Sequence, residues 1–349
     1  MTRARTLLLA SSAAFLMASI ACSGSASSSA EAGTTVVQLQ GAGATFPAPL
    51  YNRWFEDYVK AHPNAQVGYQ PVGSGAGVTQ FTNKTVDFGA SDAAMTDEEI
   101  AKVTQGVQLI PMTAGSIVLT YNLPDLSAPL RLSRKAYSDI YLGKITKWSD
   151  PAIAQANPGV NLPTLNISVV RRADSSGTTF VFTQHLSAIN PEWQKGPGTS
   201  KSPNWPTGIG SKGNEGVTSS VQQTPGAIGY VEYGYAKQSN LKFALLENKA
   251  GEYIEANTAS GQAALAGMQL PDNMRLFLPD PDGKDAYPIV TYTWLLLYRQ
   301  YDKPANAAAL KELVKYCLSD GQKVSEQMGY IPLPSAVVDA DLKALDNVK

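Results

Sequence analysis

The segment VVRRADSSGTTFVF, residues 169–182, combines residue types that bind a small oxyanion. Two arginines and an aspartate run directly into Ser-Ser-Gly-Thr-Thr, after which the chain becomes apolar. An arginine presents a planar fork that binds an oxyanion through two parallel hydrogen bonds. Hydroxyl groups add donors, and glycine lets the backbone approach a ligand closely. We therefore interpret the segment as part of a binding site for a small oxyanion.

Three other loops have the same character: GAGATF at 41–46, GSGAG at 73–77 and GASD at 89–92. Each follows a predicted strand, and three of the four loops, GASD excepted, also lead into a predicted helix. The N-terminus of a helix presents free backbone N–H groups and the positive end of its dipole, and an anion satisfies both. A single loop of this kind is more often a capped turn. Together, beyond the carboxyl ends of strands in an open α/β sheet, the four loops indicate one ligand site.

Three common motifs are absent from these loops. GAGATF lacks the Gly-Lys-Ser/Thr of a P-loop, and Phe46 breaks the spacing of a dinucleotide-binding fingerprint. Neither Ser74 nor Ser176 lies in a Gly-x-Ser-x-Gly nucleophile elbow. The two histidines, His62 after a helix and His185 on a helix face, are expected to be structural. The sequence therefore predicts no catalytic residue, no metal site and no cofactor.

Alternating strands and helices predict an α/β fold with mostly parallel sheets. Strands are expected at 35–40, 65–72, 86–91, 115–123, 166–171 and 287–299, and a strand followed by a helix at 225–236. Helices are expected at 51–62, 77–84, 133–143, 178–188, 307–318 and 321–328. The segment 191–214 is rich in Gly, Pro, Ser, Lys and Trp and is expected to be a long ordered loop.

The length and composition describe a globular protein of two domains. The chain has 349 residues, 44% hydrophobic and 16% charged, with 28 Lys+Arg against 29 Asp+Glu. This balance gives no basic surface for nucleic acid. The two cysteines, Cys22 and Cys317, provide no disulfide framework, and Cys317 is expected to be a buried free thiol in a helix.

The N-terminal residues indicate export. Residues 1–21 have the layout of a secretory signal peptide, because Arg3 and Arg5 precede an apolar run that is too short to span a membrane. The sequence SIAC resembles the lipobox at which bacteria acylate a cysteine, although Ser19 stands where leucine is commonest. Residues 22–33 form a flexible Ser/Gly/Ala tether. We expect a protein in the periplasm or on the outer face of the cell membrane, lipid-anchored through Cys22; ordinary cleavage is the alternative.

Six motifs, in order along the chain, resemble the phosphate-binding proteins of phosphate-specific ABC transporters. They are GAGATFPAPLY, VGSGAGV, VDFGASDAAMTDEE, DIYLGKITKW, VVRRADSSGTTFVFT and PGAIGYVEYGYAK. The resemblance implies a two-lobed type II periplasmic-binding-protein fold with the ligand between the lobes. Lobe I would comprise 34–114 and 288–349, and lobe II 115–287. Two strands would cross between the lobes as hinges, near Thr113–Tyr121 and Tyr287–Trp294.

The resemblance also implies a ligand set. The predicted phosphate-binding residues are Thr45, Phe46, Ser74, Asp92, Arg172, Ser176, Gly177 and Thr178. Asp174 is expected to orient and partly neutralise Arg172. Asp92 is expected to accept a P–OH group, which sulfate lacks at neutral pH, and so to repel sulfate. The chain has Gly75-Ala76 within GSGAG, whereas relatives have GSSGG, and this difference affects the start of the following helix.

The implied function is capture of inorganic phosphate outside the membrane and its delivery to the permease subunits of an ABC transporter, without catalysis. Two other functions are compatible with parts of the sequence. An exported phosphatase would use Ser74 or Ser176 as nucleophile, but no base is evident for it. A phosphate sensor would dock on a membrane signalling partner, and such a surface carries no motif.

Overall fold

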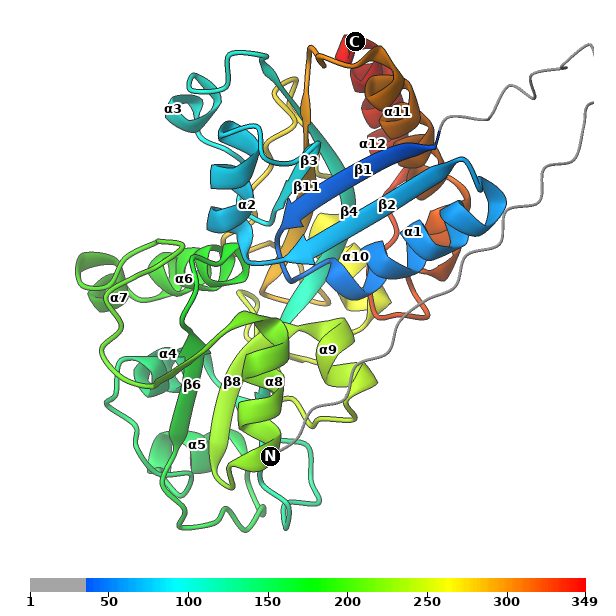
Figure 1. The fold of residues 1–349 in the computed structure, drawn as a ribbon. Coiled ribbons are helices and arrows are strands. Elements are labelled where there is room, and N and C mark those ends of the chain that lie inside the picture. The colour runs from blue at the N-terminus through cyan, green and yellow to red at the C-terminus, as the bar shows by residue number, and fades with distance from the viewer. Residues whose placement is uncertain (1–35) are drawn as a thin grey trace, which may run out of the picture. The chain divides into compact units, whose positions relative to one another are not determined.

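One eight-stranded sheet organises residues 36–349, which are the residues that the computed structural model describes (Figure 1). Its strand order is β2-β1-β3-β11-β4-β8-β6-β7. These strands are β1 (Val37–Gly43), β2 (Ala65–Pro71), β3 (Phe88–Ser91), β4 (Val107–Tyr121), β6 (Ser168–Arg172), β7 (Ile209–Ser211), β8 (Ala227–Glu232) and β11 (Val290–Tyr298). The predicted signal peptide, Cys22 and the tether lie outside the described residues.

The sheet is parallel at its two sides and antiparallel in its centre. β1, β2 and β3, the first strand group, pair in parallel, as do β6, β7 and β8, the second strand group. β4 joins the groups, because its residues 107–116 pair with β11 and its residues 117–121 pair with β8, both antiparallel. The expectation of mostly parallel sheets therefore holds for each strand group but is wrong for the centre. There, β4 and β11 run between the groups and are buried along their whole length.

Helices cover the two strand groups. α1 (Ala48–Ala61) contacts β2, and α2 (Ser74–Thr82) contacts β1 and β3. In α1, aromatic residues at positions 51, 54, 55 and 58 recur at helical spacing, so one face of the helix is buried against the sheet. α6 (Gly177–Ile189), α8 (Gly213–Gln223) and α9 (Tyr233–Gln238) lie beside the second strand group (Figure 1).

Shorter elements complete the fold. A small sheet of order β10-β9-β5 contains β5 (Arg131–Leu132), β9 (Leu245–Glu247) and β10 (Tyr253–Ile254). The other helices are α3 (Asp97–Ile100), α4 (Arg134–Tyr141), α5 (Pro151–Ala156), α7 (Pro191–Lys195), α10 (Thr258–Leu265), α11 (Pro304–Leu318), η1 (Asp320–Val324), α12 (Ser335–Ala344) and η2 (Leu345–Asn347). No helix among residues 36–349 has both the length and the apolar character needed to cross a membrane.

Helices α3, α5 and α10 and the strands of the small sheet are additional to the predicted elements. Three predicted segments also differ from the structure. The segment 191–214 is not one loop, because it contains α7 and β7 and the start of α8. The strand expected at 115–123 begins at Val107, although Pro111 usually argues against a strand. Pro111 lies at the register shift between Thr293 and Trp294, where the ladder is irregular and tolerates it.

The third difference is at the C-terminus. A helix is predicted at 321–328, but the chain forms only the 3-10 turn η1 there, and the Gly321 carbonyl accepts the indole N–H of Trp54 at 2.6 Å. The unexpected helix α12 follows Pro334. Cys317 is a buried free thiol in α11, as predicted.

Candidate functional site

Three helices begin close together, and most of the predicted binding residues lie at their N-termini. Ser74 is the first residue of α2, Gly177 is the first of α6, and Asn214 is the second of α8. Asp92 directly follows β3, and its backbone N–H donates to Ser74 Oγ at 3.2 Å. A Cβ atom on Gly177 would lie 2.4 Å from Ser74 Oγ and 2.8 Å from Asp92 Cβ, so the two strand groups meet here.

A second contact joins the groups beside this point. The backbone N–H of Gly75 donates to the carbonyl of Ser175 at 2.9 Å. A Cβ on Gly75 would lie 2.1 Å from Ser175 Oγ. Gly75, where the sequence departs from GSSGG, therefore leaves the space that the Ser175 side chain fills.

Arg172 supplies a buried cation at the end of β6. Its side chain is 1% exposed. Nε donates to Asp174 Oδ1 at 2.8 Å, Nη2 donates to Asp174 Oδ2, and Nη1 donates to Thr178 Oγ1 at 3.3 Å. A guanidinium has five N–H groups. The two that remain, one on each Nη, form the fork that an oxyanion can occupy.

Asp174 holds this cation and one of the helices. Burial alone would raise the pKa of Asp174, but the hydrogen bonds and the charge of Arg172 outweigh burial and hold the pKa below its usual value. Asp174 Oδ1 also accepts the N–H of Gly213, the first residue of α8, at 3.0 Å. Asp174 is thus a charged partner of Arg172, and it links α8 to the arginine.

Asp92 is the one carboxylate among the predicted ligand residues. It is 1% exposed, and its oxygens accept from Thr293 Oγ1 at 2.9 Å and from Thr178 Oγ1 at 3.3 Å. Burial raises the pKa of Asp92 to about 7, and the hydrogen bonds and Arg172 offset this only in part. A group with this pKa can change its protonation state with the ligand it meets near neutral pH.

Thr45 and Phe46 lie in the loop between β1 and α1, and other residues hold that loop firmly. The Thr45 carbonyl accepts from the Tyr235 hydroxyl at 2.5 Å, and the Phe46 carbonyl accepts from the Tyr330 hydroxyl at 2.8 Å. Because peptide groups are planar, bonds that fix the carbonyls also fix the directions of the following N–H groups. Thr45 Oγ1 accepts twice from Asn214, from the backbone N–H at 3.1 Å and from Nδ2 at 2.8 Å.

Ser176 and Thr178 frame the start of α6. Ser176 Oγ caps the helix by accepting the Thr179 N–H at 3.0 Å, and both Ser176 and Thr178 are fully buried. The N–H groups of Gly177 and Thr178 belong to the first turn, where a helix offers no internal acceptor. The structure therefore brings together every predicted ligand residue as well as Asp174; Cys22 alone lies outside the described residues.

Two residues of the site were missed in the sequence. Asn214 touches Thr45 and Thr178, and Thr293 donates to Asp92. The stretch GSKGNEG, residues 210–216, is another strand-to-helix turn and could have indicated Asn214, although most of it falls in the segment predicted to be a loop. Thr293 stands inside an apolar strand and gives no local signal.

Three other polar residues considered in the sequence are not part of the candidate site. Arg171 is half-buried, and its Nη1 donates to the carbonyl of Arg172 at 3.2 Å. His62 caps the C-terminus of α1, as expected. His185 lies in α6, where Tyr137 and the Pro279 carbonyl occupy its two ring nitrogens.

We predict that Gly177→Ala weakens binding of an anion at this site. Alanine has a higher helix propensity than glycine, so helix propensity does not explain a loss of affinity. The loss arises because the added methyl group would collide with Ser74 and Asp92. Overpacking of this kind costs roughly 1–3 kcal/mol, which is about 5- to 150-fold in affinity. Isothermal titration calorimetry measures it, with Gly216→Ala as control, because the nearest atoms to a Cβ there lie 3.6 Å away. Unchanged affinity in Gly177→Ala would mean that the strand groups need not approach this closely.

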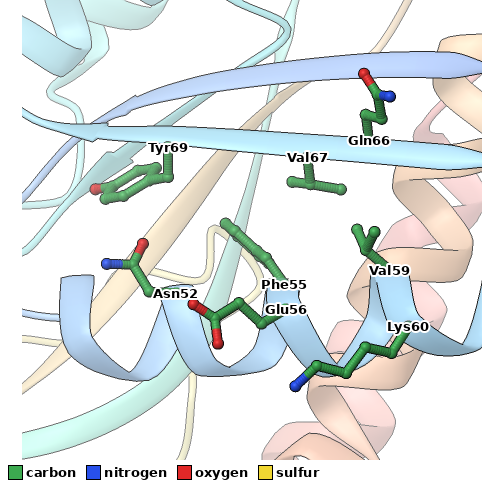
Figure 2. Close-up of a pocket in the computed structure, with 8 residues that line it drawn as sticks. All are labelled: Asn52, Phe55, Glu56, Val59, Lys60, Gln66, Val67 and Tyr69. Carbon is green, nitrogen blue, oxygen red and sulfur yellow. The ribbon is translucent and has the colours of Figure 1, made fainter.

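A groove lies elsewhere, between α1 and β2 (Figure 2). Side chains of the helix and of the strand face each other across about 520 Å³. Phe55, Val59 and Val67 make it largely apolar, and Glu56 and Lys60 supply one charge of each sign. The groove contains none of the predicted binding residues. Its lining does not suit an anion, so the buried cluster is the better candidate.

This chain is similar to known phosphate-binding proteins. A family model described as a PBP superfamily domain matches residues 28–321. The phosphate-binding protein PstS of Pasteurella multocida is 42% identical over 309 residues, covering 87% of this chain and 89% of that protein. The phosphate-binding protein PstS of Haemophilus influenzae is 41% identical over 303 residues, covering 86% and 90%.

A solved structure shares the fold. The high affinity periplasmic phosphate-binding protein PfluDING, bound with phosphate, superposes with a TM-score of 0.74 at 21% identity, covering 87% of this chain and 92% of that one. The α/β fold is therefore the type II periplasmic-binding-protein fold, as predicted. The identity and coverage of the relatives, with the family model, establish that this chain belongs to the PstS family of phosphate-binding proteins.

Proposed function

We propose that this protein binds inorganic phosphate and delivers it to the permease of an ABC transporter. The observation that carries the proposal is the buried Arg172–Asp174 pair, which lies beside the buried Asp92 where the N-termini of α2, α6 and α8 meet. An arginine fork and helix N-termini supply many donors for the oxygens of one small anion. Membership of the PstS family supports phosphate as that anion.

Asp92 is the group that selects phosphate among tetrahedral oxyanions. HPO4 and H2PO4 species both carry a P–OH that a carboxylate can accept, whereas sulfate at neutral pH carries none. Sulfate would place its charge against the carboxylate in a buried site, which is costly. The hydrogen bond from Thr293 holds one oxygen of Asp92 in place and leaves Oδ2 near Thr178.

The protein is a binding protein and not an enzyme, as its relatives are named. Its two candidate nucleophiles also lack a base. Ser74 Oγ accepts the Asp92 N–H, and Ser176 Oγ caps α6. Neither histidine contacts them: His62 bonds to the Tyr58 carbonyl, and both nitrogens of His185 are engaged.

Delivery requires the ligand to be released, and separation of two lobes is the mechanism we propose. The proposed lobes are 34–114 with 288–349, and 115–287. The contacts that closure would make are those between Gly75 and Ser175, between Thr45 and Asn214, and between Asp92 and Thr178. β4 and β11 are the strands about which the lobes would turn.

Calorimetry on the refolded, ligand-stripped protein tests the ligand. We expect phosphate and arsenate to bind and sulfate not to bind at neutral pH. Heat from sulfate but not from phosphate would overturn the proposal. Release from a chromogenic phosphate ester would instead reveal a phosphatase, and unchanged radiolabelled phosphate uptake after disruption of the gene would favour a sensor.

The proposed location is outside the cytoplasmic membrane, with a lipid anchor on Cys22. The sequence SIACSGSASSS and the tether at 22–33 support it. Cys22→Ala should move the protein from the membrane fraction to the soluble fraction, because two or more acyl chains anchor stably where none would. Fractionation followed by immunoblotting checks this. A wild type that is already wholly soluble would establish ordinary cleavage instead.

A further inference from the structure

Asn214 lies where the strand groups meet, and every polar atom of its side chain is in use. Nδ2 donates to Thr45 Oγ1 at 2.8 Å and to Thr178 Oγ1 at 3.4 Å. Oδ1 accepts the backbone N–H of Glu232 at 3.0 Å. The residue is 0% exposed, so water cannot replace these partners.

The backbone around Asn214 fixes the direction of its amide. A backbone N–H can only donate, so the N–H of Glu232 must face the oxygen of Asn214 and not its NH2 group. Gly213 adopts φ +71°, which favours glycine, and its N–H is held by Asp174. The NH2 group of Asn214 is thereby fixed toward the two threonine hydroxyls.

This arrangement determines where the hydrogen of the Thr45 hydroxyl points. A hydroxyl has two acceptor lone pairs and one hydrogen. Thr45 Oγ1 already accepts the backbone N–H and the Nδ2–H of Asn214, so its own hydrogen must point away from Asn214. Thr178 Oγ1 accepts from Arg172 and Asn214, and its hydrogen is directed at Asp92 Oδ2.

We propose that Asn214 is a positioning residue for oxyanion binding: it occupies acceptor sides of Thr45 and Thr178, so that the Thr45 hydroxyl is left to donate to the ligand and the Thr178 hydroxyl donates to Asp92, the carboxyl that would meet the ligand. An unfixed hydroxyl could rotate, and it would lose part of its donor strength to other acceptors. The inference rests on the proposed function, since it assumes an anion beside Thr45. It adds a residue that itself makes no ligand contact.

Two substitutions separate donation from simple packing. Asn214→Asp keeps the shape but offers an oxygen where the NH2 group was, so the threonine hydroxyls turn to donate to it. Asn214→Ala removes the group. Hydrogen bonds to charged groups contribute roughly 1.5–3 kcal/mol. We therefore expect each variant to bind phosphate roughly ten- to a hundredfold more weakly than the wild type. Asn214→Asp should bind phosphate more weakly than Asn214→Ala. Asn214→Ser replaces Asn214→Ala if that variant does not fold.

A double-mutant cycle distinguishes positioning from a structural role. Thr45→Val removes the hydroxyl, so adding Asn214→Ala to it should cost only about threefold more. The control is Asn248→Ala: Asn248 is equally buried but bonds to the carbonyls of Gly283, Lys284 and Ala286. This control should lower the melting temperature and leave phosphate affinity unchanged.

Calorimetry with inorganic phosphate, paired with thermal unfolding of each ligand-free variant, gives the outcome. Coupled losses at Asn214 and Thr45 support the proposal. Wild-type affinity in Asn214→Asp, or losses that simply multiply, would overturn it while leaving phosphate binding intact. If the wild-type protein does not bind phosphate, this result would instead contradict the proposed function, and the positioning role of Asn214 would be contradicted as well.

Discussion

Replacing Arg172 with alanine is expected to reduce phosphate affinity by roughly 30- to several-thousand-fold. Truncating one partner of a buried, hydrogen-bonded charge pair costs roughly 2–5 kcal/mol, at 1.4 kcal/mol per decade of affinity. The change removes the two free N–H groups aimed at the ligand and leaves Asp174, whose side chain is 11% exposed, without its cation. The stranded carboxylate would then repel the anion.

Arg171→Ala is the matched control for this measurement. Arg171 is the adjacent residue and carries the same group, but it is half-buried and its Nη1 bonds to a carbonyl. Its replacement should change phosphate affinity little in the same titration. Arg172→Lys keeps the charge without the planar fork and serves where the alanine variant does not fold. Equal losses at both positions would show that the wrong arginine was assigned.

Asp92→Asn is expected to narrow the ratio of phosphate to sulfate affinity by roughly tenfold for each pH unit above the Asp92 pKa of about 7, because sulfate must then either protonate the carboxyl or meet its negative charge. Asparagine keeps the shape, removes the charge and supplies an NH2 group that can donate to sulfate. Its amide oxygen can still accept a P–OH group, so the gain should be on the sulfate side. Titrating both proteins with both anions at neutral pH and at a higher pH, where Asp92 is fully ionised, measures the ratio. If Asp92→Asn shows no detectable sulfate binding and loses phosphate binding, Asp92 has a structural role, and other residues exclude sulfate from the site.

The pH dependence gives an independent check on Asp92. Burial raises the pKa of this carboxyl from 3.8 to about 7. Between these values the folded protein keeps a proton that the unfolded chain loses, so the free energy of unfolding falls as pH rises through this range. Below about pH 7 the protonated Asp92 can donate, and wild-type sulfate affinity should rise. In Asp92→Asn both dependences should be weaker.

The anion-binding character of the site could be predicted because its signals are local, whereas the full set of candidate ligand residues came from the family resemblance. Arg172, Asp174 and Gly177 lie within one segment of six residues. This short segment therefore indicates the cation, its carboxylate partner and the start of a helix. The other loops carry the same glycine and hydroxyl signature. Physical chemistry connects such loops to an anion without any knowledge of how they pack.

The remaining features depend on residues distant in sequence. Thr293 lies 201 positions from Asp92, and nothing in the apolar strand around it indicates a polar partner. Asn214 matters through its contact with Thr45, 169 positions away. In η1, which stands where a helix was predicted, the Gly321 carbonyl accepts the indole N–H of Trp54, 267 positions away. Each is a tertiary contact between residues distant in the sequence, and a local sequence pattern does not indicate such a contact.

A crystal structure of the protein with phosphate bound tests the central claim most directly. We expect one phosphate between the strand groups. Its oxygens should lie within hydrogen-bond distance of the Arg172 guanidinium and of N–H or hydroxyl groups at the starts of α2 and α6. One oxygen should contact a carboxylate oxygen of Asp92. A phosphate bound elsewhere, or one bound at this place with Arg172 turned away and Asp92 untouched, would contradict it.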